Sequence, residues 1–224
     1  MKDLQALRDR MVDTQIAGRG VRDPAVLQAM RKVPRESFVP DWRRDDAYAD
    51  EPLPIEEGQT ISQPYIVAAM IAAARPRSGD RALEIGTGSG YAAAVLATIV
   101  AEVYTVERLA GLAESARWRL AELGYATVHV RHANGTLGWP EHAPYDVIIV
   151  TAGGPHVPRP LLDQLAAGGR LIMPVGSGRT GQRLVRITNT GQTGHGRFER
   201  EELEAVAFVP LIGAEGWQPG QRPE

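Results

Sequence analysis

Apolar positions in the N-terminal part of the chain recur three and four residues apart. This spacing is typical of amphipathic helices, and it predicts helices over residues 3–17, from Pro24, and from Pro64. Asp23 is expected to cap the second helix, since a carboxylate just before a first-turn proline accepts free backbone N–H groups. Residues 41–63 carry prolines, acids and turn formers, so we expect a folded loop there. A loop of this length in a compact domain is often functional.

From residue 80 the pattern changes to short apolar runs that alternate with helical stretches. The predicted strands are 81–85, 102–107, 126–131, 145–150, 170–175, 183–188 and 204–212. Helices are predicted over 91–100, 109–123 and 159–169. Strands that alternate with helices predict an α/β fold with a doubly wound, mostly parallel, Rossmann-like sheet. The N-terminal helices form an extension of this fold, and the last two strands form an antiparallel pair.

The length of 224 residues fits one domain, and 43% apolar residues are enough for a full core. Four parts of this domain are expected: N-terminal helices and a covering loop (1–79), the Rossmann-like core (80–175), C-terminal strands (176–213) and a loose tail (214–224).

Composition excludes several classes of function. The formal charge of -2 gives no general attraction to nucleic acid or to an anionic membrane. The chain has no cysteine, which removes disulfides, thiolate catalysis and cysteine-ligated metals, and no metal is expected. The N-terminus lacks the apolar segment of a secretory signal, and the apolar run 65–74 is too short to span a bilayer. We therefore expect a cytoplasmic protein, and a monomer because the helices show no sustained heptad pattern.

A glycine-rich turn follows the strand at 81–85, with Gly86, Gly88 and Gly90. Such a turn lets a nucleotide-like ligand approach the backbone. The dinucleotide fingerprint needs its third glycine where this chain has Tyr91. Glu84, just before the turn, is a poor neighbour for a pyrophosphate and a suitable one for a cation. These residues favour S-adenosylmethionine over a dinucleotide, and a dinucleotide oxidoreductase stays as the alternative.

The next two strands add candidate ligand contacts. Glu107 ends the second strand, where a carboxylate accepts hydrogen bonds from ribose hydroxyls in both ligand classes. Asn134 follows the third strand, where its amide could bind adenine. An Asn-Gly pair also forms turns, and the two interpretations of Asn134 and Gly135 are equally supported.

Several motifs occur together: "VPRESFV" (33–39), "LPIEEGQTISQPY" (53–65), "LEIGTGSGY" (83–91), "VYTVER" (103–108), "APYDVIIVTA" (143–152), "LLDQLAAGGRLIMPVG" (161–176) and "VAFVPL" (206–211). With them the chain resembles the protein-L-isoaspartate O-methyltransferase family from about residue 5 to about residue 213. "GQTISQP" together with "FVPL" is more specific than the glycine motif, which many methyltransferases share.

The resemblance implies methyl transfer from S-adenosylmethionine, with S-adenosylhomocysteine as product. The partners it implies are isoaspartyl residues in damaged proteins and peptides, whose free α-carboxylate is esterified to start repair through a succinimide. It implies Ser62 as the active-site residue. Implied donor contacts are Gln59, Thr60, Ser62, Glu84, Gly86, Thr87, Gly88, Ser89, Glu107, Arg108, Asn134 and Gly135. Implied substrate contacts are Ser62, Gln63, Tyr65, Val209, Pro210 and Leu211.

The chemistry needs little acid–base help, because an α-carboxylate of pKa about 3.5 is already ionised at neutral pH. Ser62 is therefore expected to orient the carboxylate rather than to act as a covalent nucleophile. One departure is Asn134-Gly135, where the family usually has Asp-Gly. It keeps two alternatives open: methylation of an aspartate in a dedicated precursor peptide to install isoaspartate, and a module that binds the donor without turnover.

Overall fold

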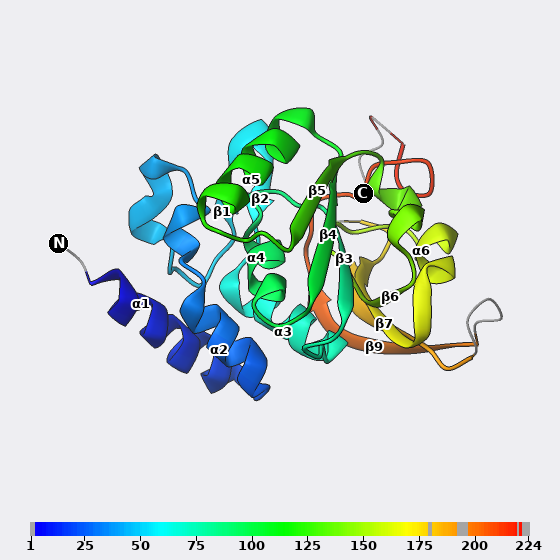
Figure 1. The fold of residues 1–224 in the computed structure, drawn as a ribbon, viewed down its shortest axis with the longest axis horizontal. Helices are drawn as coiled ribbons and strands as arrows, with labels where there is room; N and C mark the ends of the chain where they lie inside the picture. The colour runs from blue at the N-terminus through cyan, green and yellow to red at the C-terminus, as the bar shows by residue number, and fades with distance from the viewer. Residues whose placement is uncertain (1–2, 179–180, 192–196, 219, 221–224) are drawn as a thin grey trace.

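The computed structural model describes residues 3–178, 181–191, 197–218 and 220, and within them one sheet of seven strands crosses the molecule (Figure 1). Its order is β5-β4-β3-β6-β7-β8-β9. The strands are β3 (Arg81–Ile85), β4 (Glu102–Glu107), β5 (Val128–His132), β6 (Tyr145–Val150), β7 (Leu165–Val175), β8 (Gln182–Asn189) and β9 (Phe198–Val206). The strands from β5 to β7 pair in parallel, whereas β8 and β9 are antiparallel. The doubly wound, mostly parallel fold with a C-terminal antiparallel pair is confirmed.

The α-helices are α1 (Leu4–Arg10), α2 (Pro24–Lys32), α3 (Pro64–Ala74), α4 (Tyr91–Ala97), α5 (Ala110–Glu122) and α6 (Arg159–Asp163). The Asp23 side chain caps α2 as expected, by accepting the backbone N–H groups of Ala25 and Val26. The helix predicted over 3–17 is α-helical only to Arg10 and continues as a π-helical segment, Met11–Ile16. The wider turn places residues five apart on one face, which buries both Met11 and Ile16.

Alternate residues of the sheet face two different cores. Ala82, Val103, Val147, Ile149 and Ile172 pack with the helices α1 to α5. Leu83, Tyr104, Ile148, Leu171 and Met173 form the other core, which α6 covers. Because side chains alternate along a strand, the inner parallel strands β3, β4 and β6 are buried on both sides, whereas His129 and His132 of the edge strand β5 are exposed.

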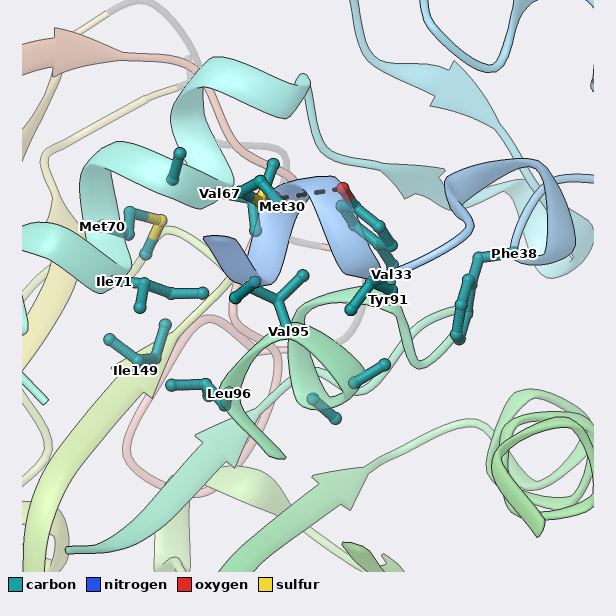
Figure 2. Close-up of a cluster of buried hydrophobic side chains, with 14 of the residues drawn as sticks. Met30, Val33, Phe38, Val67, Met70, Ile71, Tyr91, Val95, Leu96 and Ile149 are labelled. Atoms are coloured by element: carbon teal, nitrogen blue, oxygen red, sulfur yellow. Dashed lines mark hydrogen bonds between the residues drawn. The ribbon is translucent and has the colours of Figure 1, made fainter. Parts of the chain in front are cut away.

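Figure 2 shows where the N-terminal helices meet the sheet. Met30 of α2, Val67 and Ile71 of α3, Val95 of α4 and Ile149 of β6 point into one cluster, all of them buried. This packing fixes the starts of α3 and α4 relative to the sheet, and both starts lie at the site described below.

Two small elements precede α3 in the region predicted as a folded loop. The strands β1 (Leu53–Pro54) and β2 (Thr60–Ile61) pair antiparallel, and a 3-10 turn, Glu56–Gly58, joins them. The loop is thus a short hairpin that delivers Ser62 to the start of α3.

The helix predicted over 159–169 is too long. It ends at Asp163, and the backbone N–H of Tyr145 donates to the Gln164 carbonyl at 2.9 Å to begin the β6–β7 pairing. The pairing then moves from Tyr145 with Leu165 to Val147 with Arg170, so residues 166–169 are taken up as an irregularity in the strand. Sheet pairing overrides the helical pattern here.

The last strand, predicted over 204–212, runs from Phe198 to Val206. Its charged residues pair with arginines of β8, for example Glu202 with Arg183 at 3.2 Å. Such residues suit an exposed edge strand. The apolar segment after Val206 leaves β9 and crosses the carboxyl edge of the sheet, where the backbones of Gly153 and Val209 are hydrogen-bonded at 2.8 Å.

The predicted loose tail is wrong for residues 214–218. The indole N–H of Trp217 donates to the Gly153 carbonyl at 3.0 Å, and the backbone N–H of Glu215 donates to Thr136 Oγ1 at 3.2 Å. Residues 219 and 221–224 of that tail, and residues 179–180 of the turn expected after β7, lie outside the described residues. In the described part of the chain, no helix has the length and apolar character needed to cross a membrane.

Candidate active site

A crevice opens at the carboxyl edge of the sheet, between β3 and β6. The chain leaves β3 toward β4 on one side and β6 toward β7 on the other, and such a reversal is where open α/β sheets bind ligands. Two cavities of about 500 and 80 Å³ adjoin here. Both are lined by Thr60, Gly86, Gly88, Thr151 and Val209. The two cavities are therefore parts of one site.

The glycine turn forms the floor of the crevice. Gly86, Gly88 and Gly90 have φ of 96°, 52° and 92°, a region that other residues rarely adopt. A Cβ on Gly86 would lie 2.4 Å from Thr151 Oγ1, which donates to the Gly86 carbonyl at 2.8 Å. This close approach ties the turn to the end of β6 and leaves its backbone facing the cavity.

Tyr91, in the place of the third fingerprint glycine, packs sideways. Its ring is buried, lies 5.6 Å from the Phe38 ring, and sends its hydroxyl toward Met30 Sδ (Figure 2). The N-terminal segment of residues 1–79 covers this part of the sheet, and its Met30 and Phe38 accommodate the bulky Tyr91 ring. This segment is called the N-terminal cover below.

Glu84 places a buried carboxylate in the wall of the larger cavity. Its Oε2 accepts a hydrogen bond from Thr105 Oγ1 at 2.6 Å, and its Oε1 has no partner among the described residues. Burial raises the pKa of Glu84 to about 8, the negative charge of Glu107 adds to the rise, and the Thr105 hydrogen bond opposes it. A buried carboxylate with a free oxygen is costly unless a donor or a cation meets it. The wall is therefore suited to a cationic ligand group.

Glu107 stands at the end of β4 beside the smaller cavity. Its two oxygens accept the backbone N–H groups of Gly88 at 3.0 Å and of Leu109 at 2.9 Å. A carboxylate has about four acceptor positions, so lone pairs remain for hydroxyl groups of a ligand.

Ser62 and Gln63 line the larger cavity just before α3. The Gln63 amide donates to the Asp50 side chain at 2.8 Å, and the Ser62 carbonyl accepts from Arg35 at 2.8 Å. The start of α3 carries free N–H groups and a partial positive charge. This end of the crevice is therefore suited to an anion.

Most of the predicted site residues come together in this crevice. Those on the larger cavity are Thr60, Ser62, Gln63, Glu84, Gly86, Thr87, Gly88, Ser89 and Val209. Those on the smaller cavity are Gln59, Glu107, Arg108, Gly135, Pro210 and Leu211, together with the shared residues named above.

Asn134 and Tyr65 are not in the cavity walls. Asn134 Oδ1 accepts from the backbone N–H and the hydroxyl of Thr136, so this side chain caps a short 3-10 turn and its contact with adenine stays a prediction. Tyr65 lies under the guanidinium of Arg19, 3.6 Å from the ring centre, and its hydroxyl is 3.5 Å from Glu204 Oε1.

Sequence reasoning missed three polar residues of the larger cavity: Arg19, Thr151 and Glu204. Thr151 follows β6 directly, and its place at the end of a predicted strand was a usable signal. Arg19 and Glu204 come from the two ends of the chain, and no local pattern marks them.

A glycine turn at the switch point, with carboxylates at the ends of the first two parallel strands, is typical of the Rossmann-like methyltransferases. The chain belongs to the protein-L-isoaspartate(D-aspartate) O-methyltransferase (PCMT) family, whose model matches residues 6–216. The resemblance inferred from the motifs is thereby confirmed.

Named relatives agree with this assignment. The chain is 58% identical to protein-L-isoaspartate O-methyltransferase 2 of Pelobacter propionicus over 217 residues, which cover 97% of this chain and 95% of that protein. It is 60% identical to protein-L-isoaspartate O-methyltransferase 1 of Rhodopseudomonas palustris over 212 residues, which cover 95% and 85%.

Two solved structures have the same fold. A protein-L-isoaspartate O-methyltransferase superposes with a TM-score of 0.78 at 30% identity, over 93% of this chain and 67% of that one. A Plasmodium falciparum protein described as a member of this family, solved with S-adenosyl-L-homocysteine, gives a TM-score of 0.75 at 26% identity. That match covers 92% of this chain and 98% of the other.

Proposed function

We propose that this chain transfers a methyl group from S-adenosylmethionine to the free α-carboxylate of L-isoaspartyl residues in damaged proteins and peptides. The observation that carries the proposal is the crevice at the switch point, where Ser62 lies at the start of α3 and one oxygen of Glu84 in the wall has no partner among the described residues. The identity to named relatives over nearly the whole chain supports the same activity.

The residues present fit the donor. Glu107 and the glycine turn would hold the ribose and adenosine side, and Glu84 would face the cationic methionine part. The backbone of Gly135 packs closely against Ile85 in the wall of the smaller cavity, where an added Cβ would lie 2.5 Å from the Ile85 side chain. This close packing is consistent with a wall in which the backbone itself faces the donor. When bound, the donor supplies a methyl group activated by a positively charged sulfur.

The protein's own task at the acceptor is to orient an anion. The Ser62 hydroxyl and the N–H groups at the start of α3 would hold the substrate carboxylate, helped by the positive end of the helix. The carboxylate is already ionised at neutral pH, so no base has to remove a proton. An oxygen–carbon bond forms as the carbon–sulfur bond breaks, and its electron pair stays on sulfur.

The positive charge of the donor and the negative charge of the substrate carboxylate are both lost in this step. A cation and an anion react to give a neutral ester and a neutral thioether, so removal of water from both reactants should lower the barrier. The apolar side chains of Ile66, Val67 and Phe208 in the cavity wall would help to exclude water. The methoxy group of the ester leaves more readily than an oxygen of the free carboxylate, so the neighbouring backbone nitrogen can attack the ester carbonyl and close the succinimide with loss of methanol.

The direct test compares an isoaspartyl peptide with the matched aspartyl peptide, using methyl-labelled donor. We expect label on the isoaspartyl peptide in a base-labile ester and little on the aspartyl peptide. Equal or greater labelling of the aspartyl peptide contradicts the proposal, and would instead favour methylation of aspartate in a dedicated precursor. Tight binding of the donor with no transfer to either peptide contradicts it as well.

We further infer that the chain works as one methyltransferase domain and as a cytoplasmic monomer. Residues from all three parts of the chain, 1–79, 80–175 and 176–213, line the crevice, which supports a single domain. Light scattering of the purified protein tests the monomer, and a stable dimer would overturn it.

A further inference from the structure

Arg35 is a charged side chain whose burial needs an explanation. It is fully buried, no carboxylate of the described residues pairs with it, and its Nη1 has no hydrogen-bond partner there. Burial lowers the pKa of Arg35 to about 10, so it is still charged at neutral pH. A buried cation without a counter-ion is unfavourable for folding. Its contacts must therefore contribute something that an apolar side chain could not.

Those contacts join three segments that are far apart in the sequence. Nε donates to the Ala47 carbonyl at 2.8 Å, and Nη2 donates to the Ser62 carbonyl at 2.8 Å. The guanidinium also lies 4.8 Å from the centre of the Tyr91 ring, at the first residue of α4. Ser62 precedes α3 and Tyr91 follows the glycine turn, so Arg35 connects the anion end of the crevice to the donor end.

We propose that Arg35 is a positioning residue, which holds the Ser62 segment at the correct distance from the glycine turn. The inference rests on the proposed function. Arg35 does not line the cavity, so it acts through the Ser62 carbonyl and not by touching the ligands. Methyl transfer needs the reacting atoms about 3–3.5 Å apart, and a displacement of about 1 Å can reduce the rate about a hundredfold. The faster methyl transfer that a fixed Ser62 segment allows would explain why the chain keeps a buried arginine that no carboxylate of the described residues pairs with.

Arg8 offers a matched control in the same N-terminal cover. It is also buried, but it is paired with Glu36 at 2.9 Å. Among the described residues its other hydrogen-bond partners are Tyr48, Gln5 and the Arg31 carbonyl, none of which lines the crevice. Loss of either arginine removes a buried guanidinium, and only loss of Arg35 releases Ser62.

The experiment uses the full chain with Arg35→Met, Arg35→Lys and Arg8→Met, each assayed where circular dichroism shows it folded. For Arg35→Met we expect kcat on an isoaspartyl peptide to fall about tenfold or more, with the Kd for S-adenosylhomocysteine within about threefold of wild type. Hydrogen exchange should be faster at the backbone amides of residues 59–63. Arg35→Lys keeps the charge and reaches fewer carbonyls, so it should recover part of kcat, and Arg8→Met should keep kcat within about twofold.

Two results would overturn the inference: a folded Arg35→Met variant with the kcat and exchange of wild type, or an equal loss of kcat in Arg8→Met. If Arg35→Met does not fold, Arg35→Lys decides by the same two readouts. Failure of the proposed function is distinguishable, because wild type would then transfer no methyl group to the peptide. Exchange at residues 59–63 would still show whether Arg35 holds that segment.

Discussion

At the scale of single residues, Glu84 links ligand binding to pH. With a pKa of about 8 its carboxyl is mostly protonated in the empty site at neutral pH, whereas a cationic ligand group favours the ionised form. Binding of S-adenosylhomocysteine, whose ammonium group is cationic, should therefore release a proton. Affinity should rise between pH 6 and pH 8, by up to about tenfold per pH unit, and level off above the pKa.

Calorimetry in two buffers of different ionisation enthalpy measures the proton release directly. Glu84→Gln is the control, because it keeps the shape of the side chain and removes the titration. Binding of equal affinity at pH 6 and pH 8 in wild type, with no proton released, would show that Glu84 does not face the cation.

Single residues also show which tertiary contacts cannot be predicted from the sequence. Glu84 and Glu107 could be predicted because they are the penultimate and the last residue of short apolar runs, and the ends of parallel strands meet at one edge. Asn134 was placed at the correct loop, but the sequence could not show that Thr136 engages its oxygen. Arg35 lay inside a recognised motif, and only tertiary contacts reveal what it does.

At the scale of elements, the turn between β3 and α4 depends on glycine for two reasons. Gly86 has a positive φ, and a Cβ there would overlap Thr151 Oγ1 at 2.4 Å. We expect Gly86→Ala to lower the free energy of unfolding by about 1–3 kcal/mol and to weaken binding of S-adenosylhomocysteine at least about tenfold. Urea unfolding and calorimetry measure the two effects.

Gly79→Ala is the matched control for this prediction. Gly79 precedes β3, its φ is not in the left-handed region, and no atom of the described residues lies within 4 Å of an added Cβ. It should leave stability and binding close to those of wild type. If Gly86→Ala behaves like Gly79→Ala, the close packing of the turn against β6 is not important for the site.

The sequence predicts the bounds of helices and strands well where a single local pattern determines them. The bounds of β3, β4 and β6 follow from short apolar runs with turn formers on both sides. Prediction failed at the start of β7 and in β9, because sheet pairing and arginine partners on β8 decide those residues. The apolar run after Val206 looked like a strand, but its side chains line the crevice instead.

At the scale of the whole molecule, the crevice depends on segments from both ends of the chain. The Ser62 segment, the glycine turn and the Val209 segment meet only in the folded protein, so a ligand that fills the crevice binds the native state and not the unfolded chain. At a concentration of about one hundred times Kd, such a ligand stabilises the fold by about 2.7 kcal/mol. S-adenosylhomocysteine should therefore raise Tm by several degrees, about 2–4 °C per kcal/mol for a chain of this size.

The same melting experiment separates the two ligand classes that the glycine turn first suggested. NAD carries a pyrophosphate, and the buried carboxylate of Glu84 lies in the cavity wall next to the turn. At equal concentration NAD should leave Tm within error, because Tyr91 occupies the place of the third fingerprint glycine and the pyrophosphate gains no attraction from Glu84, ionised or protonated. Hydrogen exchange should slow on S-adenosylhomocysteine binding at residues 59–63 and 206–211, and change little at α6, which lies on the other core. A shift in Tm with NAD and none with S-adenosylhomocysteine would mean that the crevice holds a dinucleotide, and the methyl-transfer proposal would then be wrong at its first step.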